Sequence, residues 1–166
     1  MIFRKWPAVV LSILTSASLQ AQTRFEYRHP QMGTVFKLVL YAPDSIVAQR
    51  AAQAAFARVD TLNAILSDYL PESELNRLCA QAGTGRKIQV SRDLWMVLRL
   101  SDKFSKQSKG AFDATIGPLT RLWRRARNLK AVPDSAKVEQ AKALVGYKMV
   151  HFYPRRHRVR LAKRGM

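Results

Sequence analysis

The most informative stretch of the sequence reads Gly110-Ala111-Phe112-Asp113-Ala114-Thr115-Ile116-Gly117-Pro118-Leu119. Gly110 is well placed to end the helix before it, because glycine adopts the left-handed backbone of a helix terminus without steric penalty. Pro118 can occupy the first turn of the helix after it, where a missing N–H costs nothing. Asp113 between them is a common turn or capping residue. The stretch therefore predicts a connection between two helices.

Before this connection, the sequence predicts two extended segments and a long helix. The segments are residues 24–28 and 35–41, and the second is rich in β-branched and aromatic residues. Residues 29–34 should form a bend whose backbone can approach a ligand, because Gly33 permits positive φ. Asp44 should cap a helix that ends near Tyr69, since Pro71 disfavours helical geometry in the residue before it. We expect this helix to pack an alanine-rich stripe against a sheet, and the stripe comprises Val47, Ala51, Ala54, Ala55, Val59, Leu62 and Leu66.

The remaining predicted elements are short and irregularly ordered. Ser73 and Ser91 should cap two helices, separated by a strand at 87–90. Further helices are expected from Pro118 through Trp123 and from residues 134–135 to 144, followed by a hairpin of 147–153 and 158–161. The helix after Ser91 should bury Leu94, Trp95, Leu98 and Phe104. This order favours the α+β class, with a doubly wound Rossmann sheet as the lesser alternative.

Composition indicates one folded unit with a strongly basic surface. The chain has 166 residues, of which 48% are hydrophobic, and its net charge is +18. The basic residues concentrate in 121–130 and 155–164, where few aromatic residues could stack on bases. We therefore expect no nucleic-acid partner, but a solvated basic surface that could make a peripheral membrane contact. The one cysteine, Cys79, cannot form an intrachain disulfide, and we expect a buried, inert thiol.

Residues 1–21 have the layout of a secretory signal peptide, with basic, apolar and small-residue regions in order. The apolar region is far shorter than the roughly 20 residues that a bilayer span needs. We predict cleavage after Ala21, with Ser18 as the alternative site because Leu19 is large for the minus-three position, and a mature domain over residues 22–166. The protein should then be periplasmic or lie at the periplasmic face of the inner membrane. No cysteine near the cleavage site could carry a lipid anchor.

Three stretches in order carry a resemblance to a known family: Met32-Gly33-Thr34, Leu66-Ser67-Asp68-Tyr69 followed by Ser73-Glu74-Leu75-Asn76, and Gly110 to Leu119. Common nucleotide, zinc and serine-hydrolase motifs are absent from the sequence. From Met32 onward the chain resembles the amino-terminal half of the FAD:protein FMN transferases, the ApbE family. The resemblance implies a T-fold-like flavin-transferase architecture that is incomplete at the C-terminus.

The resemblance also implies a reaction and a partial site. Members of this family cleave FAD and attach FMN through a phosphoester to a threonine of an exported or membrane-bound acceptor, with Mg²⁺ assisting and AMP leaving. The positions that match FAD contacts in the family are Met32, Tyr69, Ala111, Phe112 and Asp113. Soft, aromatic and hydrogen-bonding side chains suit a flavin nucleotide. Taken singly, each of three residues also has an ordinary structural explanation. Met32 could fill the core, Tyr69 could be a half-buried structural aromatic residue, and Asp113 could be a turn residue.

Neither the catalytic residues nor the magnesium ligands are identified in this sequence. In the family, an Asp-Leu-Gly-Gly-x-x-Lys-Gly segment follows the last hairpin and supplies part of the metal site. We expect that site outside this chain, which should then be inactive alone. The acceptor is expected to be a flavoprotein subunit of a membrane electron-transport complex. A FAD hydrolase, a non-catalytic flavin-binding remnant and a basic protein that binds anionic surfaces remain the alternatives.

Overall fold

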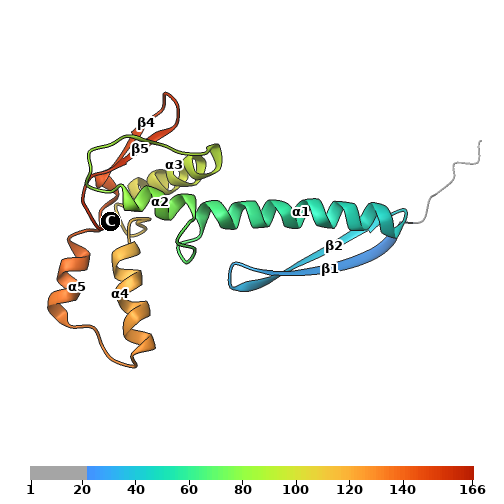
Figure 1. Ribbon diagram of the computed structural model, residues 1–166, viewed down its shortest axis with the longest axis horizontal. Coiled ribbons are helices and arrows are strands. Elements are labelled where there is room, and N and C mark those ends of the chain that lie inside the picture. The colour runs from blue at the N-terminus through green and yellow to red at the C-terminus, as the bar shows by residue number, and fades with distance from the viewer. Residues whose placement is uncertain (1–21) are drawn as a thin grey trace, which may run out of the picture.

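The computed structural model describes residues 22–166, and the predicted signal peptide lies outside the described residues (Figure 1). Helices and strands are mixed without regular alternation, which confirms the α+β class. No helix in the described part of the chain is long and apolar enough to cross a bilayer. In chain order, the elements are β1 Thr23–Gln31, β2 Thr34–Ala42, α1 Ser45–Leu66, α2 Glu74–Ala80, β3 Ile88–Gln89, α3 Arg92–Gln107, α4 Gly117–Asn128, α5 Ser135–Lys142, the 3-10 turn η1 Tyr147–Met149, β4 Val150–Tyr153 and β5 Arg158–Leu161.

Strands β1 and β2 form an antiparallel hairpin that lies along α1 (Figure 1). The expected bend over residues 29–34 is tighter than predicted, because the strands continue to Gln31 and Thr34. Only Met32 and Gly33 remain in the turn, with φ of 53° and 73°. Pro30 is tolerated within β1 because the hairpin has only edge strands. The turn is therefore held at the end of two long, paired strands.

The face of α1 that contacts the hairpin differs from the predicted one. Ala48 and Ala52 are buried, and the Phe56 ring stacks on His29 with 4.9 Å between ring centroids. Most of the predicted stripe is exposed, including Val47, Ala51, Ala54 and Ala55. Alanines lie on several sides of this helix, so their spacing did not determine which side is buried.

The main core lies where α2 and α3 pack against a three-stranded antiparallel sheet of order β3-β5-β4. Strand β3 is shorter than predicted. Leu94 is buried as expected, but Phe104 is 49% exposed, which contradicts the prediction for that residue. Asp102 and Ser105 continue the inner face of α3 at helical spacing and take the place expected for Phe104. The main buried residues of this core are Leu78, Ala82, Val90, Leu94, Val159, Leu161 and Met166.

Helices α4 and α5 form a second projection from this core (Figure 1). Pro118 lies in the first turn of α4, as predicted. Asp134 caps α5 by accepting a hydrogen bond from Ala136 N at 2.7 Å. Helix α4 contacts the chain just after the end of α1, where Arg124 of α4 forms an ion pair with Asp68.

Candidate functional site

Met32 and Tyr69, two of the predicted contact residues, line one groove of about 690 Å³. Met32 comes from the β1–β2 turn and Tyr69 from the turn after α1. Their side chains are 43% and 69% exposed, so both are available to a ligand. We call this the Met32–Tyr69 groove, and its lining comprises Gln31, Met32, Gly33, Asn63, Leu66, Ser67, Asp68, Tyr69 and Leu70.

The turn that presents Met32 is strained and anchored. A positive φ is uncommon for a residue other than glycine, asparagine or aspartate, and costs about 1 kcal/mol or more. Gln31, the preceding residue, donates from Nε2 to Asp60 Oδ1 at 2.7 Å and accepts from Asn63 Nδ2 at 3.0 Å. His29 Nε2 also lies 2.7 Å from Asp60 Oδ1. These contacts join the end of the hairpin to α1 and fix Met32 over the groove.

Asp60 is therefore the main anchor of this turn. Hydrogen bonds from Gln31 and His29 lower the pKa of the Asp60 carboxyl below its usual value. Sequence spacing alone gave His29 no carboxylate partner, because Asp60 is distant in the chain and becomes a neighbour only when the hairpin packs on α1. The pair is structural, since both groups serve the hairpin contact.

Tyr69 owes its position to an early helix end and to Arg124. Helix α1 ends at Leu66 rather than near Tyr69, because Ser67 Oγ accepts hydrogen bonds from the backbone N–H groups of Tyr69 and Leu70, each at 3.2 Å. The Arg124 guanidinium lies 3.9 Å from the centroid of the Tyr69 ring. Its Nη2 is 2.6 Å from Asp68 Oδ2, and this hydrogen bond raises the pKa of Arg124.

Tyr69 also lines a second groove, of about 580 Å³, along the exposed side of α4. We call it the α4 groove, and its lining comprises Tyr69, Ile116, Leu119, Thr120, Trp123, Arg124 and Arg127. Arg124 lines the α4 groove but not the Met32–Tyr69 groove. The Tyr69 side chain is 69% exposed and lines both grooves, so a flat aromatic ligand could stack on its ring.

The three other predicted contact residues form a separate turn. Asp113 Oδ1 accepts hydrogen bonds from the Thr115 N–H at 2.8 Å and the Thr115 hydroxyl at 2.7 Å. Asp113 Oδ2 accepts one from Tyr147 N at 2.7 Å. Ala111 and Phe112 are exposed, and neither they nor Asp113 line the Met32–Tyr69 groove. In this structure the Asp113 carboxylate joins the connection before α4 to the chain after α5.

Sequence reasoning missed Arg124 and Thr115. Thr115 Oγ1 also accepts a hydrogen bond from Gly146 N at 2.7 Å, which adds a second connection between this turn and the chain after α5. The Asp113-x-Thr115 spacing was a local signal for this role, because Asp side chains commonly accept from residues two positions later. No local signal pointed to Arg124, whose partners come from a distant part of the chain.

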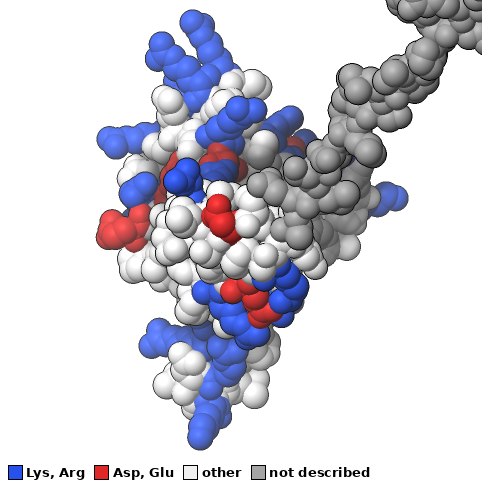
Figure 2. Space-filling view, turned by 90° about the vertical axis from the view of Figure 1, so that its right-hand side faces the viewer, with Lys and Arg blue, Asp and Glu red and all other residues white. Residues whose placement is uncertain are grey.

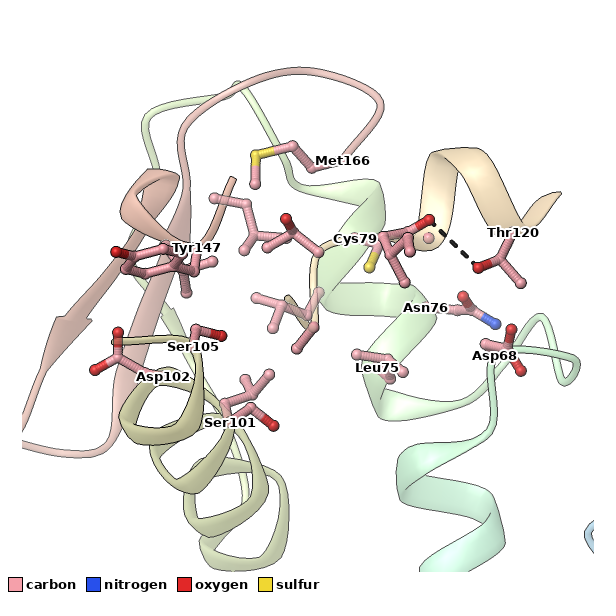
Figure 3. A pocket seen from close by; sticks show the side chains of 18 of the residues that line it. Asp68, Leu75, Asn76, Cys79, Ser101, Asp102, Ser105, Thr120, Tyr147 and Met166 are labelled. Atoms are coloured by element: carbon pink, nitrogen blue, oxygen red, sulfur yellow. Dashed lines mark hydrogen bonds between the residues drawn. The ribbon is translucent and has the colours of Figure 1, made fainter. Parts of the chain in front are cut away.

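A smaller cavity of about 220 Å³ lies between α2, α3, the start of α4 and the sheet (Figure 3). Its lining is mostly apolar and includes Cys79, Ser105 and Met166. Cys79 is partly buried, and burial raises the pKa of its thiol, which disfavours the reactive thiolate. Asp68 reaches both this cavity and the Met32–Tyr69 groove.

Between Gln22 and Met166, no group of three His, Cys, Asp or Glu side chains is arranged to hold a metal ion. No magnesium ligand is therefore assigned among the described residues. The groups that the geometry offers to a ligand are an exposed aromatic ring, a thioether and the polar rim of the Met32–Tyr69 groove. These suit binding and orientation rather than bond breaking.

Comparison with curated proteins gives relatives of one kind. The FAD:protein FMN transferase of Treponema pallidum is 28% identical over 149 residues, covering 85% of this chain and 41% of the relative. That of Haemophilus influenzae is 29% identical over 117 residues, covering 69% and 34%. One from Klebsiella pneumoniae is 30% identical over 117 residues, covering 69% and 33%. The chain thus spans between about a third and two fifths of the length of these relatives.

Solved structures share the fold. The ApbE protein of Thermotoga maritima aligns with a TM-score of 0.74 at 23% identity, covering 84% of this chain and 45% of the other. The flavin transferase ApbE of Vibrio cholerae, as its H257G mutant, aligns with a TM-score of 0.75 at 21% identity, covering 86% and 49%. The model of the ApbE family matches residues 32–166, which include every predicted contact residue. This chain belongs to the ApbE family.

Proposed function

We propose that this protein acts in FAD:protein FMN transfer and supplies part of the flavin-binding surface. The observation that carries the proposal is the convergence of Met32 and Tyr69 on one open groove. Curated relatives of this chain are named FAD:protein FMN transferases. The groove provides what a flavin ring needs, a flat aromatic surface beside a polarizable thioether.

The proposed reaction transfers the FMN moiety of FAD through its phosphorus. The hydroxyl oxygen of an acceptor threonine releases its proton to solvent and forms a bond to the phosphorus on the FMN side of FAD. The bond between that phosphorus and the bridging pyrophosphate oxygen breaks, and AMP leaves with this oxygen and the bond's electron pair. In this scheme Tyr69 and Met32 hold the isoalloxazine, so that the pyrophosphate is presented in one orientation.

Magnesium, export and a membrane-associated acceptor belong to the same proposal. Mg²⁺ would neutralise charge on the phosphates. None of its ligands is assigned among residues 22–166, which show no metal-binding group. Residues 1–21 have the composition of a secretory signal, which supports action in the periplasm. The proposed acceptor is a flavoprotein subunit of a membrane electron-transport complex.

The flavin site is tested by FAD binding to the chain and two single variants. Tyr69→Ala should weaken FAD affinity about tenfold, because stacking and the buried ring area are lost. Tyr41→Ala is the matched control, since Tyr41 is similarly exposed, at 61% against 69% for Tyr69, but lies on β2 outside both grooves. Flavin fluorescence titration measures both. Equal affinities of the two variants would contradict the assignment of Tyr69.

The transfer is tested with FAD, magnesium and an acceptor domain that carries the threonine. Covalent flavin on the acceptor, seen by fluorescence in a denaturing gel and lost in a Thr→Ala acceptor, would support transferase activity. Release of FMN and AMP without labelling would instead mean that water replaces the threonine hydroxyl. Because this chain is expected to be inactive alone, FAD binding without either product fits both the transferase and the non-catalytic flavin-binding alternative. Covalent labelling of the acceptor by residues 1–166 alone would contradict that expectation.

A further inference from the structure

The connection between α4 and α5 lies at the outer end of the α4–α5 projection (Figure 1), and its exposed side chains are basic or apolar. We define the α4 tip as Arg125, Arg127, Leu129, Lys130 and Val132, which form the last turn of α4 and the loop that follows. All five side chains are exposed. Figure 2 shows Lys and Arg side chains at this lower end of the molecule without acidic neighbours on the visible face. The tip is independent of the proposed flavin groove at Met32.

The charge of this segment is one-sided. Five basic residues and no acidic residue lie between Ala114 and Pro133. Arg124 pairs with Asp68, and Arg121 donates to the Gly165 carbonyl at 2.9 Å. Within the described residues, the ion pairs do not include Arg125, Arg127 or Lys130. Three cations are therefore available for an anionic partner.

Apolar side chains stand among these cations. Leu129 is 67% and Val132 85% exposed, and Trp123, one turn before Arg127, is half-exposed. The loop backbone is ordered by hydrogen bonds from Lys130 N to Arg127 O at 3.1 Å and from Ala131 N to Ala126 O at 3.0 Å. Leu129 and Val132 therefore lie on a hydrogen-bonded turn at the end of α4.

We propose that the α4 tip binds the surface of a bilayer that contains anionic phospholipids. Arginine and lysine can pair with lipid phosphates, while Leu129 and Val132 enter the apolar boundary beneath the headgroups. A nucleic acid would satisfy the charges but offers no apolar phase for the two aliphatic side chains. Trp123 is also the sole aromatic residue between Asp113 and Gly146, so the segment has no row of rings for base stacking.

The first test is sedimentation of the full chain with vesicles of phosphatidylglycerol and phosphatidylcholine, against phosphatidylcholine alone. The triple variant R125Q/R127Q/K130Q should lose about a hundredfold in affinity for the anionic vesicles, because each basic residue near the surface contributes to binding. The variant L129N/V132N, which keeps the charge, should lose about tenfold. Circular dichroism checks that each variant is folded, and all substituted positions are exposed.

The matched control is R86Q/K103Q/R155Q, which removes the same charge from exposed positions outside the α4–α5 projection. This control should retain nearly full affinity for the anionic vesicles. Residues 1–21 are the same in all variants, so they do not contribute to the differences between them. An environment-sensitive fluorophore on Leu129→Cys, in a Cys79→Ser background, should shift to the blue on vesicles, whereas one on Lys103→Cys should not.

Two outcomes would overturn the proposal. Equal losses in the tip and control variants would mean that net charge alone drives the binding. Weak vesicle binding combined with tight duplex DNA binding, lost in R125Q/R127Q/K130Q, would assign the tip to nucleic acid instead.

Discussion

The Met32–Tyr69 groove and the turn around Asp113 were both expected to contact the same ligand, but their side chains are held in different ways. Met32 and Tyr69 are both exposed. The backbone N–H of Met32 donates a hydrogen bond to the Gln31 side chain, and the Arg124 guanidinium lies over the Tyr69 ring. Both Asp113 carboxylate oxygens already accept hydrogen bonds from the chain itself. The predicted contact residues thus include two exposed side chains and one carboxylate whose oxygens are already hydrogen-bonded within the chain.

The largest effect should follow from breaking the Asp113 turn. Asp113→Ala leaves the Tyr147 and Thr115 N–H groups without their acceptor, which should cost about 2–4 kcal/mol of unfolding free energy. Urea unfolding measures the loss. Asp134→Ala is a suitable control, because it removes one exposed helix cap and should cost only about 1 kcal/mol. Similar losses in the two variants would mean that Asp113 does not fix this turn.

A second effect should separate support of the Tyr69 ring from direct ligand contact. Arg124→Gln removes the cation beside Tyr69 and the ion pair with Asp68, so the ring should lose its fixed orientation. We expect FAD affinity to fall about threefold to fivefold, less than for Tyr69→Ala. In the double variant Y69A/R124Q, the Arg124 change should add nothing further. Additive losses would show that Arg124 acts on the ligand itself.

Helix caps and turns could be predicted from the sequence more fully than contacts between distant segments. The caps Asp44, Ser73 and Ser91 accept the hydrogen bonds that their residue types favour. The buried face of α1 was not predictable, because alanines lie on several sides of it and only the hairpin selects one.

The pairing of Met32 with Tyr69 was predicted only through family resemblance, since no spacing rule joins a hairpin turn to a helix end. Arg124 could not be identified at all, because its role depends on where α4 lies relative to the end of α1. The sequence thus predicted side chains that satisfy neighbouring backbone groups, whereas the contacts that assemble the groove required the fold.

A third variant should separate backbone strain from ligand contact within the groove. Met32→Asn places a residue that tolerates positive φ before Gly33, which gives the Asn-Gly pair favoured in two-residue hairpin turns. The unfolding free energy should rise by about 0.5–1 kcal/mol, while FAD affinity should fall because the thioether is lost. Urea unfolding and flavin titration provide the two values. Lower stability with unchanged affinity would indicate that Met32 is a packing residue.

The smallest effect should come from titrating the anchor of that turn. The folded-state pKa of Asp60 is depressed below its ordinary 3.8 by hydrogen bonds from Gln31 and His29. The stabilisation from its ionised form is therefore present above about pH 4 and is lost as the pH falls through the lower folded-state pKa. The difference in unfolding free energy between the wild type and Asp60→Asn should stay constant from pH 6 to pH 4 and shrink in more acidic buffer. A difference that is independent of pH down to complete acid unfolding would show that the Asp60 charge does not hold the hairpin on α1, and that Met32 is fixed by the turn alone.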